Sequence, residues 1–296
     1  MRSELNARIG RTMPSPLFGV LVEGPHDAAV GMASGTRWPQ PARPVWMLGV
    51  LLAALWPHWS YVARRLVDGS DEPWGVLAAL TVIVLVVRDR AQLAQPTRSA
   101  VVASAVLAIA AAVAHLVLPD LAAAVVAMLA LGLYLVHALR RPATPLVVLL
   151  LLTLPFIASL QYYLGFPLRL LVAHASAWLL TLGGLDAMAA GASIVHAGTT
   201  VLVDAPCAGI GMLWLGSFTA ALLSYLQRAD APTTLVNGAA AATLVLLANI
   251  ARNTVLFFPE AGLADWPAWS HEAVGLVTFS AALVPLVIFI SVRSSR

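Results

Sequence analysis

The chain has 296 residues, of which 60% are apolar and 10% are charged, and its mean hydropathy is +0.86. The apolar residues recur in blocks of near-spanning length, which indicates a helical protein that crosses a membrane several times. The net charge of +3 does not indicate nucleic-acid binding, because the arginines lie between the apolar blocks, where they set membrane orientation. A single cysteine excludes an internal disulfide and argues against a multi-thiol metal site, so no metal or cofactor is expected.

The first segment, residues 1–44, differs in composition from the rest of the chain. It contains several Gly, Pro and Arg residues and no apolar run longer than "LFGVLV". A secretory signal peptide needs a longer apolar region, so none is predicted. We expect a flexible cytoplasmic tail over residues 1–44 and a single transmembrane domain over residues 45–296.

Eight apolar blocks are candidates for membrane-spanning helices, since about 20 apolar residues cross a hydrocarbon layer of roughly 30 Å. These blocks are 45–62, 74–88, 99–118, 121–139, 145–163, 207–226, 233–256 and 273–292. A ninth block, 168–184, is interrupted by polar residues and ends in a Gly-Gly pair.

The arginines decide how the ninth block is placed. Basic residues favour the cytoplasmic side, which puts Arg140, Arg141 and Arg228 inside. An even number of crossings must then lie between residues 164 and 206, so a single span at 168–184 is excluded. We expect this block to lie as a helix along the outer interface, with eight spans and both termini in the cytoplasm.

The stretch "ASIVHAGTTVLVDAP", residues 192–206, is rich in β-branched residues on either side of an Ala-Gly step. This pattern predicts a short extracytoplasmic β-hairpin that leads into Cys207. The expected fold is therefore an all-α polytopic membrane protein with about eight transmembrane helices, an interfacial helix and this hairpin.

Cys207 is expected at the outer end of the span 207–226, with Pro206 at the first helical position. The positive end of a helix lowers a thiol pKa and favours the nucleophilic thiolate, although Asp204 opposes this unless its side chain caps the helix. Gly209 and Gly211 remove side-chain bulk nearby. From these residues alone an inert, packed cysteine remains an open alternative.

Arg252 and His271 are predicted to lie at the same outer level of the membrane as Cys207. In "LLANIARNTVLFF", Asn249 and Arg252 are three residues apart and share a helical face. An arginine in an apolar segment either pairs or acts on a ligand, and snorkelling to the interface is the alternative. Ser270 is a candidate N-cap, which puts His271 in the first turn of the last span.

Topology alone does not single out this histidine. Four others are predicted near the same side: His58, His115, His174 and His196.

Three short blocks together resemble the exosortase/archaeosortase family. They are "PCAGIG" before an apolar helix, "NIAR" at 249–252 and "HEAVG" at 271–275, within residues 145–292. The resemblance implies Cys207 as nucleophile with Arg252 and His271 as catalytic partners. Ala208 stands where many members have serine. Asn249, Glu272 and Asp204 are candidate supporting residues.

The resemblance implies a membrane-embedded cysteine protease or transpeptidase. Its expected partners are membrane lipids and exported proteins that end in a sorting signal: a Pro-Glu-Pro-like (PEP-CTERM) motif, a transmembrane helix and a basic tail. Cleavage would pass through a thioester at the periplasmic face of a bacterial inner membrane. The alternatives are an envelope polysaccharide transport or assembly component and a lipid-directed acyltransferase.

Overall fold

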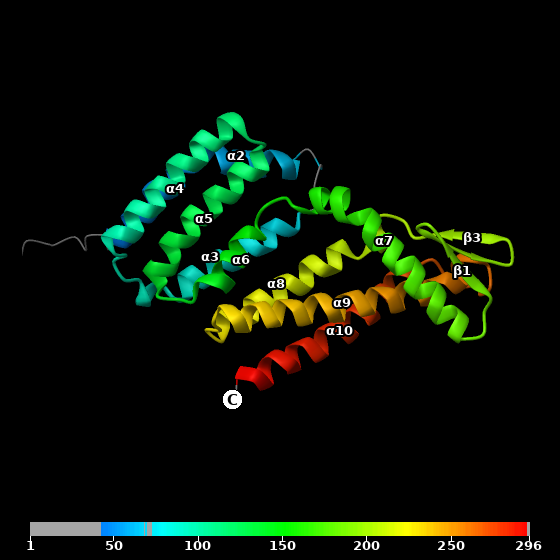
Figure 1. Cartoon of the computed structure of the whole chain (residues 1–296). Helices are drawn as coiled ribbons and strands as arrows, with labels where there is room; N and C mark the ends of the chain where they lie inside the picture. Colours follow the sequence, from blue (N-terminus) through cyan, green and yellow to red (C-terminus); the bar gives the residue numbers. More distant parts are fainter. Residues whose placement is uncertain (1–42, 68, 70–72, 295–296) are drawn as a thin grey trace, which may run out of the picture. The chain divides into compact units, whose positions relative to one another are not determined.

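The computed structural model describes residues 43–67, 69 and 73–294 of the chain. The expected tail over residues 1–44 therefore lies almost entirely outside the described residues. Residues 41–296 belong to one compact unit. Helices dominate its described part, as the apolar blocks predict (Figure 1).

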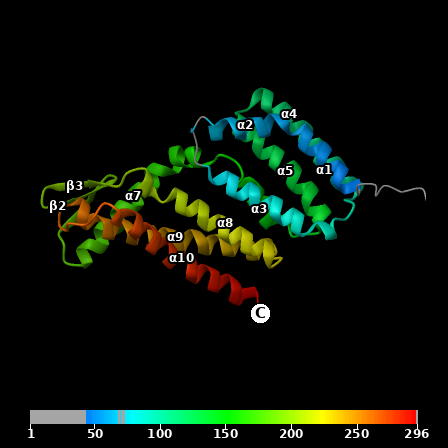
Figure 2. The ribbon, with the colours of Figure 1, turned by 180° about the vertical axis from the view of Figure 1, so that it is seen from behind.

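The N-terminal half contains five α-helices and one 3-10 turn. Their bounds are α1 (Arg43–Ala54), α2 (Trp56–Val67), α3 (Trp74–Arg88), η1 (Arg90–Gln92), α4 (Arg98–Val117) and α5 (Asp120–Leu139). Helices α4 and α5 pack against each other as an antiparallel pair, which the views from both sides show (Figures 1 and 2). Helices α1 and α2 meet at an angle of 61°.

The C-terminal half contains the other five α-helices and a small sheet. Their bounds are α6 (Ala143–Leu151), α7 (Ile157–Leu182), β1 (Ala187–Ala190), β2 (Ser193–His196), β3 (Thr199–Leu202), η2 (Pro206–Ala208), α8 (Ile210–Leu226), α9 (Ala231–Glu260) and α10 (Ser270–Ser294). Helix α9 packs between α8 and α10, while α7 supports the sheet (Figure 2).

The all-α polytopic architecture is confirmed. Among the described residues, five helices are long and apolar enough to cross a membrane, namely α4, α5, α7, α9 and α10. The bent pair of α1 and α2 makes a sixth candidate, and α3 and α8 are shorter apolar helices. Because α8 has 17 residues, it is about 26 Å long, close to the thickness of a hydrocarbon core.

The expected span 145–163 and the separate interfacial helix 168–184 are wrong in their boundaries. Helix α6 ends at Leu151, and α7 then runs without interruption from Ile157 to Leu182. The break lies at Pro155, which has no backbone N–H and disfavours the helical conformation of the residue before it. The Thr153 hydroxyl also bonds the Leu150 carbonyl within this turn.

Helix α7 continues through its polar residues because their side chains find backbone acceptors. Thr181 donates its hydroxyl to the Ala177 carbonyl one turn earlier, and His174 lies 2.8 Å from the Leu170 carbonyl. The Ser176 hydroxyl donates across to the Ile250 carbonyl of α9. Because these three side chains bond to backbone carbonyls, they do not mark a helix boundary.

The expected hairpin is present as β2 and β3, with Ala197 and Gly198 in the turn between them. It is one part of a three-stranded antiparallel sheet in the order β1-β2-β3. Strand β1 has the sequence "AMAA", which lacks the β-branched residues that mark a strand in sequence. The sheet packs on α7 mainly through β1.

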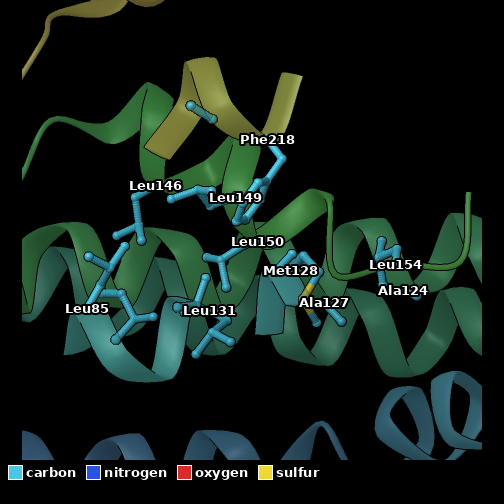
Figure 3. Close-up of a cluster of buried hydrophobic side chains, with 14 of the residues drawn as sticks. Leu85, Ala124, Ala127, Met128, Leu131, Leu146, Leu149, Leu150, Leu154 and Phe218 are labelled. Carbon is cyan, nitrogen blue, oxygen red and sulfur yellow. The ribbon is translucent and has the colours of Figure 1, made fainter. Parts of the chain in front are cut away.

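The largest apolar core joins the two halves of the unit. Leucines of α6 pack between α3, α5 and α8, and small alanines on α5 let these helices approach closely (Figure 3). The side chains labelled there are Leu85, Ala124, Ala127, Met128, Leu131, Leu146, Leu149, Leu150, Leu154 and Phe218.

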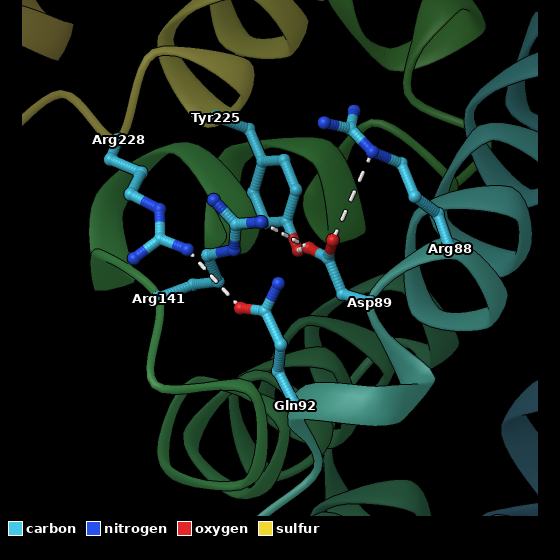
Figure 4. Close-up of polar contacts among 6 residues, drawn as sticks. All are labelled: Arg88, Asp89, Gln92, Arg141, Tyr225 and Arg228. Carbon is cyan, nitrogen blue, oxygen red and sulfur yellow. Dashed lines mark hydrogen bonds and ion pairs between the residues drawn. The ribbon is translucent and has the colours of Figure 1, made fainter.

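A buried polar cluster connects the ends of α3, α5 and α8 (Figure 4). The Arg141 guanidinium lies 2.6 Å from the Asp89 carboxylate, and both side chains are about 95% buried or more. The Tyr225 hydroxyl donates to the same carboxylate at 2.9 Å, while Arg141 also lies over the Tyr225 ring. At the edge, Arg228 donates to Gln92 at 3.1 Å. The hydrogen bond between Tyr225 and Asp89 thereby joins the end of α8 to the end of α3, 136 residues earlier in the chain.

The cluster predicts unequal effects for two arginines. Arg141→Ala leaves the Asp89 carboxylate buried without its closest cation, so we expect a loss of about 3–5 kcal/mol in unfolding free energy. Arg88 is half exposed and lies 3.9 Å from Asp89, so Arg88→Ala should cost about 1 kcal/mol or less. Thermal unfolding of the purified protein in detergent, followed by tryptophan fluorescence, measures both. Equal midpoints for the two variants would contradict this description of the cluster.

Candidate active site

Cys207 lies in the 3-10 turn η2, directly before α8. Pro206 begins this turn, and Gly209 ends it with a φ of 83°, after which the α-helix starts at Ile210. The cysteine was expected at the first turn of the helix itself. It instead precedes the helix, because the left-handed residue Gly209 separates the two helical segments.

Two asparagines of α9 hold this turn through its backbone. Asn249 Nδ2 donates to the Cys207 carbonyl at 2.9 Å, and Asn253 Nδ2 donates to the same oxygen at 3.2 Å. Asn253 also donates to the Asn249 carbonyl at 2.8 Å. All three residues are at least 90% buried, so these bonds are strong constraints on where the turn lies. They tie Cys207 to the turn of α9 that carries Arg252.

Gly209 is the point of closest approach between this turn and α9. A Cβ atom at Gly209 would lie 2.7 Å from Asn249 Cγ, which is too short for any side chain. A Cβ atom at Gly211 would meet no heavy atom of the described residues within 4 Å. Of the two glycines that the sequence singles out, only Gly209 is therefore required by the geometry.

The thiol is buried, with 5% of the residue exposed. Burial and, to a smaller extent, a hydrogen bond with Asp204 together raise the pKa of Cys207 to about 12, while the Arg252 guanidinium acts in the opposite direction. The sequence-based expectation of a lowered thiol pKa is wrong. Asp204 does cap the turn, since its Oδ1 accepts the Cys207 N–H at 3.2 Å, but its charge remains beside the thiol.

Arg252 and His271 are in direct contact between α9 and α10. Arg252 Nη2 lies 2.9 Å from His271 Nε2. A guanidinium has only donors, so Nε2 must accept, and the proton of the neutral imidazole is on Nδ1. Nδ1 lies 3.8 Å from the Glu260 carboxylate at the end of α9. The histidine is thus oriented from both sides.

Gly275 makes room for this pair. It lies one helical turn after His271 on α10, and a Cβ atom there would come within 3.3 Å of Arg252 Nε. Arg252 Nε is buried and has no hydrogen-bond partner among the described residues. The guanidinium therefore keeps an unused donor next to the contact with His271.

The structure brings together most of the residues predicted from sequence. Arg252 and His271 are bonded, and Cys207 is joined to the same part of α9. Among the described residues no hydrogen bond links the Cys207 thiol to His271. Asn249 contacts Cys207 rather than Arg252, and the carboxylate paired with His271 is Glu260 rather than the exposed Glu272.

The other candidate histidines lie elsewhere. His58 on α2 and His115 on α4 form an edge-to-face pair with ring centroids 5.7 Å apart. His174 lies on α7, and His196 on β2 contacts the Asp186 carbonyl at 2.8 Å. Contact with Arg252 distinguishes His271 from these four.

Three residues near the site were missed by the sequence interpretation: Asn253, Glu260 and Gly275. The spacing of Asn249 and Asn253, four residues apart, places both on one helical face and is a signal in the sequence. Glu260 has no comparable signal, because its contact depends on where the loop after α9 returns. In the described parts of the chain, no three His, Cys, Asp or Glu side chains converge as metal ligands.

A comparison with protein-family models identifies the chain's relatives. The transmembrane exosortase model matches residues 59–288, more than three quarters of the chain. The chain belongs to the transmembrane exosortase family. The matched region of this exosortase includes Cys207, Arg252 and His271 as well as α3 to α9. No curated protein and no solved structure matches the chain.

The raised thiol pKa predicts how this exosortase reacts with alkylating reagents. The rate of iodoacetamide modification should rise with pH through pH 9 and 10, well past about 8.5, where an ordinary cysteine reaches its midpoint. Asp204→Asn keeps an acceptor for the Cys207 N–H but removes the negative charge, so its profile should shift to lower pH. Intact mass spectrometry measures both profiles. A plateau below about pH 8.5 in the unmodified sequence would contradict the buried, neutral thiol.

The two glycines predict opposite outcomes on alanine substitution. Gly209→Ala forces a left-handed alanine, which costs about 1–2 kcal/mol, and adds the contact with Asn249. Gly211→Ala lies in α8 with open space around it, so it should be neutral or slightly stabilising. The midpoint of thermal unfolding tests the pair. A Gly209→Ala protein as stable as Gly211→Ala would exclude the close approach.

Proposed function

We propose that this exosortase is a cysteine transpeptidase or protease that cleaves the C-terminal sorting signal of exported proteins through a thioester on Cys207. The signal would consist of a Pro-Glu-Pro-like motif, a membrane helix and a basic tail. Family membership supports a membrane protein-sorting transpeptidase. The observation that carries the finer proposal is the bonded pair of Arg252 and His271 beside the turn that holds the only cysteine.

Substrate binding would switch the partner of Arg252. In the arrangement described above, the guanidinium occupies the lone pair of His271 Nε2, so this nitrogen cannot accept a proton. A scissile carbonyl oxygen has two lone pairs and can accept from the guanidinium donors, including the unpartnered Nε. Its arrival would free Nε2 to take the thiol proton. The neutral resting thiol and the blocked base agree with a site that is activated only when substrate is present.

The chemical steps then follow in order. The Cys207 thiol gives its proton to His271 Nε2, and the sulfur attacks the carbonyl carbon of the substrate. Arg252 stabilises the oxyanion of the tetrahedral intermediate. The C–N bond breaks as the His271 imidazolium protonates the leaving amine, and a thioester remains on Cys207. An amine acceptor or water then attacks the thioester and regenerates the thiol. Glu260 stabilises the imidazolium during the first half.

The two ends of α8 support a periplasmic location for this chemistry. The helix begins just after Cys207 and ends beside the arginine-rich cluster of Figure 4, about 26 Å away. That distance is close to the thickness of the hydrocarbon core, and arginines favour the cytoplasmic side. We therefore propose an inner-membrane protein with both termini in the cytoplasm and Cys207 near the outer face.

The proposal predicts a graded loss of activity. The assay follows cleavage of an exported reporter protein that ends in a Pro-Glu-Pro motif, an apolar helix and an arginine-rich tail. Cys207→Ala should abolish cleavage, and Arg252→Ala should lower it about 10²–10³-fold, as expected for an oxyanion donor. His271→Ala should lower it about 10²–10⁴-fold, as expected for an acid–base residue.

His174→Ala is the matched control, because His174 is an exposed histidine on α7 without contact to Arg252. It should cleave the reporter at the unmodified rate. Full cleavage by Cys207→Ala would exclude the proposed nucleophile. A fatty acyl group on Cys207 in place of a peptide would favour lipid-directed acyl transfer.

A further inference from the structure

Strand β3 has one free edge. In the β2–β3 pair, Val203 N–H donates to the Ala192 carbonyl, and the register pairs Ile194 with Val201. In an antiparallel pair, hydrogen-bonded and non-hydrogen-bonded positions alternate. The backbone groups of Val201 and Val203 therefore face β2, and those of Thr200 and Leu202 face away from the sheet.

The free edge is open to its surroundings. Thr200 and Leu202 are exposed, and no hydrogen bond of the described residues uses their N–H or C=O groups. Within the described part of the chain, β3 pairs with β2 alone, so β3 is an edge strand of the sheet. Strand β1, at the other edge, is instead held against α7. The side chains of Val201 and Val203 are buried in the sheet's core, so the strand is firmly placed.

The same strand leads directly to the reactive turn. Only four residues separate Leu202 from Cys207, so the end of the free edge lies no more than about 18 Å along the chain from the nucleophile. The segment between Leu202 and Cys207 is also held in place, since Gln161 Nε2 on α7 donates to the Ala205 carbonyl at 3.3 Å. The outward edge of β3 is thereby held within this chain distance of Cys207.

We propose that the segment of the polypeptide substrate next to the scissile bond binds as a fourth strand on β3. This inference rests on the proposed function and specifies how its substrate is held. Unpaired N–H and C=O groups at a sheet edge are complementary to one ligand chemistry above all, an extended peptide backbone. Pairing through the backbone would fix the direction and register of the peptide, whereas few of the substrate's side chains would be recognised.

Proline substitutions test the edge without touching the β2–β3 ladder. Thr200→Pro and Leu202→Pro each remove an outward N–H, which an edge strand tolerates. Each should lower cleavage of the Pro-Glu-Pro reporter at least tenfold, whereas Thr200→Ala, which keeps the N–H, should cleave normally. Ala189→Pro is the matched control on β1, because Ala189 pairs with Ile194 at a non-hydrogen-bonded position and also faces outward.

A cross-linking experiment does not depend on the proline variants folding. A photoreactive phenylalanine analogue replaces Leu202 in a Cys207→Ala background, which holds the reporter but cannot cleave it. If the reporter binds as a strand, its cross-linked positions should recur at every second residue, because alternate side chains share a face.

The outcomes separate the two proposals. Alternating cross-links together with loss of cleavage in Thr200→Pro support the fourth strand. Normal cleavage by both β3 proline variants, or cross-links to successive residues without alternation, would overturn the fourth strand and leave Cys207 chemistry standing. A reporter that the unmodified protein does not cleave and the Cys207→Ala protein does not cross-link would overturn the proposed function and this inference together.

Discussion

The site depends on one constraint, the pair of hydrogen bonds that Asn249 and Asn253 donate to the Cys207 carbonyl. The cysteine precedes α8 in a short turn that has few bonds of its own, so its position must be imposed by a neighbour. The two buried carboxamides impose it from α9, and Gly209 allows the approach by having no side chain. Because Arg252 lies between the asparagines in sequence, fixing the turn also fixes the cysteine relative to the guanidinium.

A second set of polar contacts acts at the far end of α8. There Tyr225 and Arg141 converge on the buried Asp89 carboxylate, which joins the N-terminal helices to the C-terminal ones (Figure 4). Apolar packing alone gives little directional preference among helices in a membrane, where lipid is as apolar as leucine. Directional polar bonds at both ends of α8 therefore set its position along its axis, and with it the level of the reactive turn.

Much of this was predictable from sequence, and the failures have identifiable causes. Apolar block length predicts most of the helices, and the membrane topology places Arg252 and His271 at one level, where they are in contact. The break at Pro155 was missed because the apolar run continues through it, and nothing in the sequence distinguishes it from Pro167 and Pro285, which lie inside α7 and α10. The thiol pKa was misjudged because burial, which raises it most, is a tertiary property. Glu260 was missed for the same reason.

The central claim is that the turn held by the two asparagines presents Cys207 as the nucleophile. Intact mass spectrometry of the purified protein mixed with the Pro-Glu-Pro reporter, quenched in acid, tests it most directly. The account predicts an adduct on Cys207 with the mass of the reporter's N-terminal product, released by hydroxylamine as a thioester would be. Product formation at full rate with Cys207 remaining unmodified and open to alkylation throughout would contradict it.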